Sequence, residues 1–160
     1  MSIDIIQADL SSAQHAAAII TLLDSYASGT AGGGKPLADY TRQNLIRCLR
    51  ERQDTLAILA YDAETPVGLV IAFEGFSTFL CKPLLNIHDV IVLEKYRGRG
   101  IVQKMFSKVE DIARQRGCCK LTLEVLSNNT PALSAYHKAG FKSYELDPVM
   151  GQALFWEKKL

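Results

Sequence analysis

The chain has 160 residues, a length that predicts one domain with a hydrophobic core of its own. Hydrophobic residues make up 48% and charged residues 22% of it, a balance typical of folded globular proteins, so disorder is not expected. The 18 basic and 17 acidic side chains nearly cancel, so no overall field attracts nucleic acid or a membrane surface.

The N-terminal stretch MSIDIIQADL has neither the basic segment nor the apolar segment of a signal peptide. Polar or acidic residues interrupt every apolar run well short of a membrane span. The cysteines form no C-x-x-C pair and therefore spell out neither a zinc site nor a redox motif; they are Cys48, Cys81, Cys118 and Cys119. We expect a cytoplasmic protein that binds no metal and whose cysteines are reduced core residues.

The first half of the chain predicts a strand, two helices and two further strands. Residues 11–14 have the S-x-x-Q form of a capping box, and the apolar residues after them recur at helical spacing until Ser28. Pro36 suits the first turn of the second helix. The expected elements are a strand near 3–5, helices at 11–28 and 36–52, and strands at Thr55–Tyr61 and Val67–Phe73.

The second half contains the most apolar strand and the clearest helical stripe of the chain. Leu84–Leu93 is apolar on both faces from Val90 onward, as expected of a central strand. Residues 102–113 repeat apolar side chains at helical spacing, and the pattern ends near Gly117. Further strands are expected at Lys120–Leu126, Phe141–Glu145 and Ala153–Lys159, and a helix at Pro131–Ala139.

These elements follow the order β-α-α-β-β-β-α-β-α-β-β. The order predicts an α/β (α+β) fold, in which helices flank both faces of a mixed central β-sheet. The chain contains no repeats, low-complexity segments or long linkers, so we expect residues 1–160 to form a single domain.

The stretch GTAGGGKP at residues 29–36 has the G-x-x-x-x-G-K spacing of a phosphate-binding P-loop. A working P-loop follows a strand, precedes a helix and carries a Ser or Thr hydroxyl for magnesium. This stretch follows a predicted helix instead, and Pro36 supplies neither the hydroxyl nor an N–H group. We therefore interpret it as a flexible interhelical linker.

A second candidate phosphate loop, YRGRGIV at residues 96–102, follows the most apolar strand and opens the clearest helix. Gly98 and Gly100 allow the backbone to turn sharply and to approach a ligand closely. The amides of the next helical turn and the helix dipole favour an anion there, and Arg97 and Arg99 add positive charge. The alternative is an ordinary strand-to-helix turn with exposed arginines.

Residues 97–102 resemble the R/Q-x-x-G-x-G/A signature of the GNAT superfamily of N-acetyltransferases, with Val102 in the place of the closing Gly or Ala. Two later segments, LEVLSNNTPA at 123–132 and YHKAGF at 136–141, fit that family's L-x-V-x-x-x-N-x-x-A and Y-x-x-x-G-F patterns in order and spacing. The resemblance covers about residues 87–141, and the N-terminal half agrees in the order of its elements. It implies a GNAT-like fold and an acyltransferase that depends on acetyl-CoA.

The resemblance also implies where acetyl-CoA, as co-substrate, would bind. The main-chain amides of one loop would hold its pyrophosphate; these are Arg97, Gly98, Arg99, Gly100, Ile101 and Val102. The backbone of Val90, Ile91 and Val92 would pair with its pantetheine arm like an added strand. Asn129 would hydrogen-bond that arm, Tyr136 would lie beside it, and Lys138 would approach the nucleotide end. Members of this family often dimerise, so a homodimer is implied as well.

Acetyl transfer requires that the amine lose a proton, that the carbonyl oxygen be stabilised and that the leaving thiolate be protonated. Tyr136 matches the family's general-acid tyrosine; the alternative is a half-buried aromatic side chain on a helix. A backbone N–H near Val92 would stabilise the oxygen.

Two residues are candidates for the base. Glu124 matches a glutamate that some members use; the alternative is a carboxylate paired with a surface cation. Histidine is the side chain whose ordinary pKa lies nearest neutrality, so His88 could act as the base, or it could be a structural histidine. Because His88 and Asp89 are neighbours in a strand, we expect them to point to opposite faces.

The stretch FSTFLCKP at 76–83, followed by IHD at 87–89, is distantly similar to the polyamine (diamine) acetyltransferase branch, which has an acidic residue at the position of His88. We expect a primary amine of a small molecule to attack directly in a ternary complex, without a nucleic-acid or membrane partner. The alternatives are a protein N-terminus or lysine as acceptor, and a non-catalytic acyl-CoA-binding module. In this family the connection formed by GTAGGGKP borders the acceptor cleft, so it could order over a bound amine.

Overall fold

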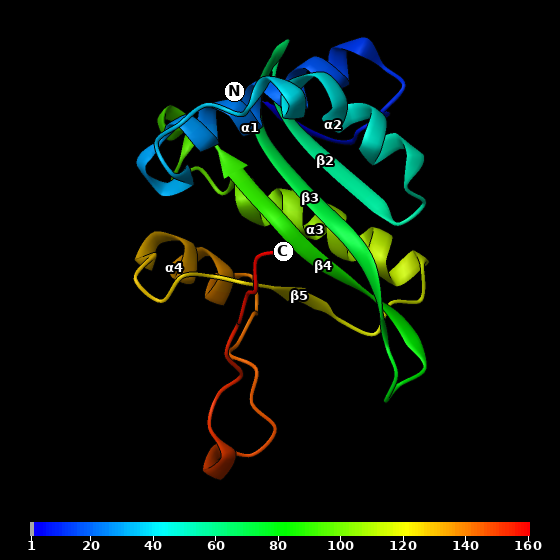
Figure 1. The fold of residues 1–160 in the computed structure, drawn as a ribbon, viewed down its shortest axis with the longest axis vertical. Helices are drawn as coiled ribbons and strands as arrows, with labels where there is room; N and C mark the ends of the chain where they lie inside the picture. Colours follow the sequence, from blue (N-terminus) through cyan, green and yellow to red (C-terminus); the bar gives the residue numbers. More distant parts are fainter. Residues whose placement is uncertain (1) are drawn as a thin grey trace. The chain divides into compact units, whose positions relative to one another are not determined.

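The computed structural model describes residues 2–160 and consists of two compact units, the first ending at Leu123 and the second spanning Glu124–Leu160. The first unit contains a sheet and three α-helices, and Figure 1 labels all of them except the first strand. Its elements are β1 (Ile3–Gln7), α1 (Ala13–Ser28), α2 (Asp39–Glu51), β2 (Thr55–Asp62), β3 (Thr65–Ser77), β4 (Lys82–Val92), α3 (Ile101–Gln115) and β5 (Leu121–Leu123). The second unit contains α4 (Thr130–Lys138).

The sheet has the order β1-β2-β3-β4-β5. The first four strands pair antiparallel, and β5 pairs parallel to β4. The chain therefore forms the mixed sheet that the sequence predicts, and the α/β (α+β) class is confirmed.

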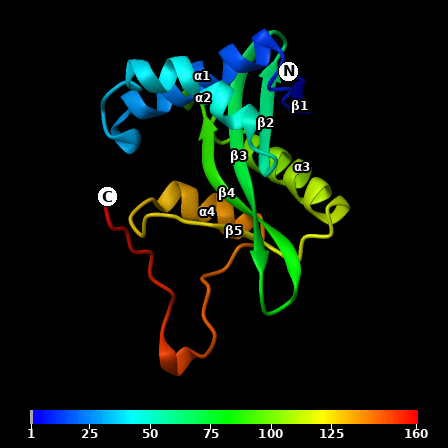
Figure 2. The ribbon, with the colours of Figure 1, turned by 45° about the vertical axis from the view of Figure 1, so that its right-hand side comes forward.

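Helices cover both faces of this sheet, with α1 and α2 on one face and α3 on the other (Figure 2). On the first face, Leu22 of α1 and Leu49 of α2 pack with Ile71 of β3 in one buried cluster. On the second face, α3 buries the apolar stripe predicted for it, including Phe106 and Val109. The apolar spacing of these helices thus explains which side of each helix faces the sheet.

A β-bulge interrupts the pairing of β3 with β4. Ile71 pairs with Asp89, whereas the next residue, Ala72, pairs with Ile87, so His88 is an extra residue in β4. Such a bulge bends its strand and increases the local twist. On its other edge β4 pairs with β5 only over Leu85–Ile87. Past the bulge, that edge of β4 therefore has no strand partner within the described sheet.

The starts of the first two helices differ from the prediction. Ser12, not Ser11, caps α1, because its hydroxyl accepts the His15 N–H at 3.4 Å. The second helix begins at Asp39, three residues after Pro36. Asp24 on α1 accepts the Leu37 N–H at 2.8 Å, and this bond holds the chain outside the helix over these residues.

The GTAGGGKP stretch forms a hydrogen-bonded turn and not the flexible linker that composition predicts. The Gly34 N–H donates to the Gly29 carbonyl at 3.0 Å. A Cβ on Gly32 would overlap the carbonyl oxygen of Tyr26, so the turn needs a residue without a side chain there. The turn follows α1 and not a strand, in agreement with the rejection of a P-loop.

The described residues form neither of the two strands expected at Phe141–Glu145 and Ala153–Lys159. One backbone hydrogen bond, from Ala153 N–H to the Tyr144 carbonyl at 3.1 Å, joins the two stretches. Four large apolar side chains in and beside these stretches are at least 75% exposed; they are Leu146, Leu154, Phe155 and Trp156. A strand is stabilised mainly by packing one of its faces, and most of the large apolar side chains of this segment are exposed instead.

The cysteines are free, but the expectation that they are core residues is wrong, because Cys48 and Cys81 are exposed and Cys118 and Cys119 are half-buried. No helix within residues 2–160 is long and apolar enough to cross a membrane.

Candidate functional site

The loop between β4 and α3 holds two glycines in a conformation that favours glycine. Gly98 and Gly100 both have φ of +73°. A Cβ built on either would meet no heavy atom within 4 Å, so the backbone of this loop is open to a ligand on that side. The two glycines thus have the backbone conformation and the open space that close approach of a ligand would require.

The loop leads into the start of α3. Gly100 is the N-cap of the helix, which receives no side-chain cap, and the Lys104 N–H makes its first intrahelical bond, to the Gly100 carbonyl at 3.2 Å. The amides of the first turn have no carbonyl partner within the helix, and the helix dipole is positive at this end. Ile101 is buried and Val102 half-buried, so the side chain of Val102 is partly packed against the protein. The arrangement can accept an anionic group such as a phosphate.

The two arginines of the loop make different contacts. The Nε of Arg97 donates to the Val92 carbonyl at 3.1 Å and thereby ties the loop to the end of β4. The guanidinium of Arg99 lies over the ring of Tyr96, 5.3 Å from its centroid. Both arginines are exposed. The loop therefore combines positive charge with a fixed connection to the central strand.

The strand that precedes the loop supplies an open backbone edge. Val90 and Val92 are half-buried and Ile91 is buried, and all three pair with β3 on one side. Past the bulge at His88 no β5 residue pairs with the other side of β4 in the described sheet. An extended ligand with amide groups can hydrogen-bond such an edge.

The bulge also places His88 and Asp89, and the prediction that they point to opposite faces is wrong. The His88 ring lies 5.6 Å from the ring of Phe73, edge to face, and Asp89 pairs with Ile71. Phe73 and Ile71 both pack in the cluster under α1 and α2, so His88 and Asp89 lie on that same face. The extra residue of the bulge breaks the alternation of the strand.

Asp89 is the more buried of the two residues. Burial raises the pKa of its carboxyl group, and the neighbouring charge of His88 lowers it in part. His88 is exposed. The bulge thus brings together an accessible imidazole and a partly desolvated carboxyl group.

The remaining predicted residues lie in the second unit: Tyr136 and Lys138 on α4, Asn129 just before it and Glu124 just after β5. The Asn129 side chain caps this helix, since its Oδ1 accepts the Ala132 N–H at 3.3 Å. Tyr136 is half-buried, with its ring 6.3 Å from that of Phe141, and Lys138 is exposed in the last turn. Glu124 is exposed and follows β5, which ends at Leu123, so its predicted place within a strand is wrong.

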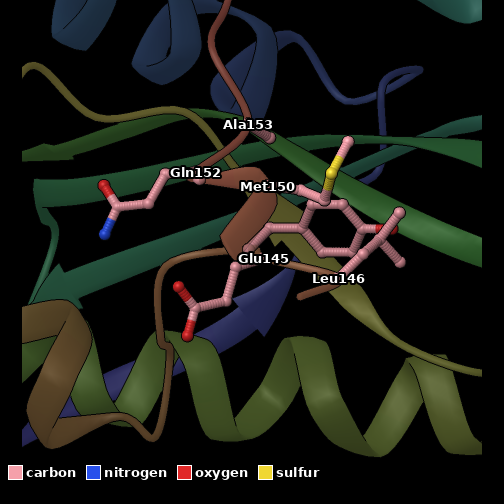
Figure 3. A pocket seen from close by; sticks show the side chains of 7 residues that line it. Glu145, Leu146, Met150, Gln152 and Ala153 are labelled. Atoms are coloured by element: carbon pink, nitrogen blue, oxygen red, sulfur yellow. The ribbon is translucent and has the colours of Figure 1, made fainter. Parts of the chain in front are cut away.

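A small pocket in the second unit contains none of the predicted site residues. It is lined by Tyr144–Leu146 and Met150–Ala153 (Figure 3). In Figure 3 the polar side chains of Glu145 and Gln152 point away from those of Met150 and Leu146.

One hydrogen bond beside the loop was not predicted from the sequence. The hydroxyl of Tyr96, the residue just before Arg97, donates to the Asp62 carboxylate at 3.0 Å. The adjacency of Tyr96 to the glycine-rich loop is visible in the sequence, but its partner is 34 residues away and no local pattern marks it.

Solved structures of acetyltransferases share this fold. An aminoglycoside acetyltransferase from an uncultured soil metagenomic sample matches with a TM-score of 0.75, covering 100% of this chain and 99% of that chain at 22% identity. AAC(6')-Iy in complex with the bisubstrate analog CoA-S-monomethyl-acetylneamine matches with a TM-score of 0.78 at 16% identity, covering 100% of both chains.

Sequence comparisons find relatives that are also named acetyltransferases. Streptothricin acetyltransferase of Streptomyces lavendulae is 33% identical over 102 residues, which are 64% of this chain and 52% of that protein. Thialysine N-epsilon-acetyltransferase of Bos taurus is 34% identical over 74 residues, 46% of this chain and 43% of that protein. The chain thus spans about half the length of the curated relatives it matches.

The family model described as the acetyltransferase (GNAT) family matches residues 18–141. This range includes all of the signature segments at 97–102, 123–132 and 136–141. The chain therefore belongs to the GNAT family of acetyltransferases.

Proposed function

We propose that this protein transfers the acetyl group of acetyl-CoA to a primary amine of a small molecule. The observation that supports this most directly is the start of α3. There Gly98 and Gly100 hold the left-handed conformation beside open space, and the amides of the first helical turn follow. Such a cradle fits the pyrophosphate of the cofactor.

The unpaired edge of β4 supports the second part of the cofactor site. Val90 to Val92 would pair with the pantetheine arm, and Arg97 links this edge to the phosphate loop through the Val92 carbonyl. When bound, acetyl-CoA supplies an acetyl group activated as a thioester. The CoA-containing analog in the AAC(6')-Iy structure is consistent with such a site on this fold.

The residues at the bulge suit an amine acceptor. A lysine-like amine has a pKa of about 10.4 and is a cation at neutral pH. In our proposal the Asp89 carboxylate attracts that cation, and His88, which is exposed beside it, accepts its proton. Glu124 is the second candidate base, acting directly or through water.

Tyr136 is the general acid in this proposal. The Tyr136 hydroxyl would protonate the leaving thiolate, since phenols titrate close to thiols. Asn129 would donate its amide N–H to the pantetheine arm, because its Oδ1 already caps α4. Lys138 would approach the nucleotide end, and an N–H at Val92 would stabilise the oxyanion.

The acceptor class rests on the names of relatives. Streptothricin, thialysine and the aminoglycosides, named for proteins that this chain resembles, are small molecules with amino groups. A structure named ribosomal-protein-alanine N-acetyltransferase, from Brucella melitensis, also matches, with a TM-score of 0.67. A protein N-terminus is therefore the second candidate acceptor.

A thiol-release assay with acetyl-CoA tests the acceptor class. The panel should contain aminoglycosides, streptothricin, thialysine, polyamines and peptides with free N-termini. We expect release with at least one small amine and none with the peptides. Release with peptides alone would move the assignment to protein acetylation, and binding of CoA without any release would indicate a non-catalytic module.

A further inference from the structure

Tyr96 is held from several sides at the entrance to the phosphate loop. The residue is only 8% exposed, and its hydroxyl donates to Asp62 Oδ2 at 3.0 Å. Tyr96 ends a 3-10 turn after β4, and Asp62 is the last residue of β2. The bond therefore ties the beginning of the loop to a strand that lies two places away from β4 in the sheet.

The backbone around Tyr96 is fixed as well. Its N–H donates to the Leu93 carbonyl at 2.8 Å, and the Arg97 N–H donates to the Glu94 carbonyl at 3.1 Å. The side chain and the main chain thus fix Tyr96 together, immediately before the first residue of the loop. A shift of the ring would move Arg97 and the glycines that follow.

Two cationic side chains lie over the ring of Tyr96. The Lys95 ammonium lies 5.1 Å and the Arg99 guanidinium 5.3 Å from the ring centroid. An aromatic face attracts cations at such distances. The hydrogen bond to Asp62 raises the pKa of Tyr96, so the hydroxyl remains a donor at neutral pH. The position of Arg99 therefore depends on where this ring is held.

We propose that the Asp62–Tyr96 pair is a positioning device that sets the 97–102 loop and the Arg99 guanidinium for the phosphates of the cofactor. This inference rests on the proposed function, because it needs the loop to bind those phosphates. Neither residue has to touch the cofactor. The pair acts by keeping the phosphate cradle in its bound shape before the ligand arrives, which lowers the cost of ordering it.

The test removes the hydrogen bond and little else. Tyr96→Phe keeps the ring under Arg99, Asp62→Ala removes the acceptor, and Asp62→Asn keeps a carbonyl oxygen in its place. The matched control is Tyr40→Phe, on an exposed ring of α2. Calorimetric titration of CoA should show about ten-fold weaker binding for Tyr96→Phe and Asp62→Ala, a change typical of one lost charge-assisted hydrogen bond. Asp62→Asn and Tyr40→Phe should bind nearly as the wild type does.

A double variant shows whether the two residues act as one. Because both changes remove the same bond, Tyr96→Phe with Asp62→Ala should bind CoA no more weakly than either single variant. Losses that multiply would mean that the residues act separately and would overturn the proposal.

Kinetics distinguish a positioning role from a general structural one. Tyr96→Phe should raise KM for acetyl-CoA, leave kcat and KM for the amine unchanged, and leave the turnover of acetyl-pantetheine, which has no phosphates, as in the wild type. If Tyr96→Phe lowered kcat/KM equally with acetyl-CoA and with acetyl-pantetheine as the acetyl donor, the proposal would be overturned. If the wild type binds no CoA, the proposed function itself fails; if wild type and variants bind CoA equally, only this inference fails.

Discussion

Asp89 carries a carboxyl group whose ionisation is opposed by its surroundings. Burial raises its pKa above the unfolded value of about 3.9, and the charge of His88 offsets this in part. The folded state therefore favours the protonated form. The contribution to stability is complete below the unfolded pKa and is lost as the pH rises through the folded pKa. At neutral pH the ionised Asp89 is thus a cost to folding, consistent with a residue kept for acceptor binding.

We predict that Asp89→Asn raises Tm at pH 7 by about 2–4 °C, which corresponds to about 1 kcal/mol for a chain of this size. The variant resembles the protonated form, so the gain should shrink as the pH falls through the raised pKa of folded Asp89 and should be gone below the unfolded pKa of about 3.9. At the same time KM for the amine should rise, because the charge that attracts it is gone. Thermal unfolding followed by circular dichroism between pH 3 and 8 measures the first effect.

Asp54 provides the control for that experiment. Its hydrogen bond to Arg52 lowers the pKa of Asp54, which is the opposite direction. Asp54→Asn should therefore bring no gain at neutral pH. A Tm for Asp89→Asn that stays below the wild type at every pH would show that the carboxylate stabilises the bulge.

Tyr136 is the residue on which the acid role depends. We predict that Tyr136→Phe lowers kcat by about ten- to a thousand-fold, the range of general acid catalysis, because the leaving thiolate loses its proton donor. Binding of CoA should be kept, since the ring still packs against Phe141. Steady-state kinetics on a confirmed acceptor, with a calorimetric CoA titration beside it, measure both. Unchanged turnover would remove Tyr136 from the mechanism.

At the scale of elements, the start of α3 carries most of the cofactor site that we propose. Gly100 has a φ of +73°, and Gly117, after the other end of the helix, has a φ of +70°. In both places a Cβ would meet nothing within 4 Å. Alanine at either position therefore causes similar backbone strain, but only Gly100 lies in the loop.

We predict that Gly100→Ala and Gly117→Ala each lower the free energy of unfolding by about 1 kcal/mol, the cost of a left-handed conformation for a residue with a side chain. Only the change at Gly100 should weaken CoA binding, and Gly100→Glu should abolish it by bulk and negative charge at the anion site. Urea unfolding and CoA titration measure the two effects. Equal CoA binding by Gly100→Glu and wild type would place the phosphates elsewhere.

The main elements of the first unit were predictable because the spacing of their apolar residues marks the face that each element buries. The stripe of α3 and the apolar run of β4 both have their predicted roles. The bulge at His88 was not predictable, since an extra residue in one strand depends on pairing with the next and leaves no local pattern. The late start of α2 also depends on a contact that is distant in sequence, because the Leu37 N–H donates to Asp24 on α1.

At the scale of the whole molecule, the three signature segments indicated the family, and the match over residues 18–141 confirms it. The sharp turn at Gly98 and Gly100 was predictable from sequence, because it depends on the local chain alone. The Asp62–Tyr96 bond was not, because it joins residues 34 positions apart. The last two predicted strands do not form, since alternating apolar residues specify a strand only where a packed face exists for them. The cytoplasmic location and the homodimer stay predictions.

The most direct test of the central claim is acetyl transfer that depends on the 97–102 loop. Wild type and Gly100→Glu are each incubated with acetyl-CoA and the amine panel, and mass spectrometry follows both the free thiol and the acetylated amine. We expect wild type to release thiol only when an amine is present, with one acetylated product for each thiol, and the variant to release none. Equal transfer by both proteins, or no transfer by the wild type to any amine, would contradict the claim.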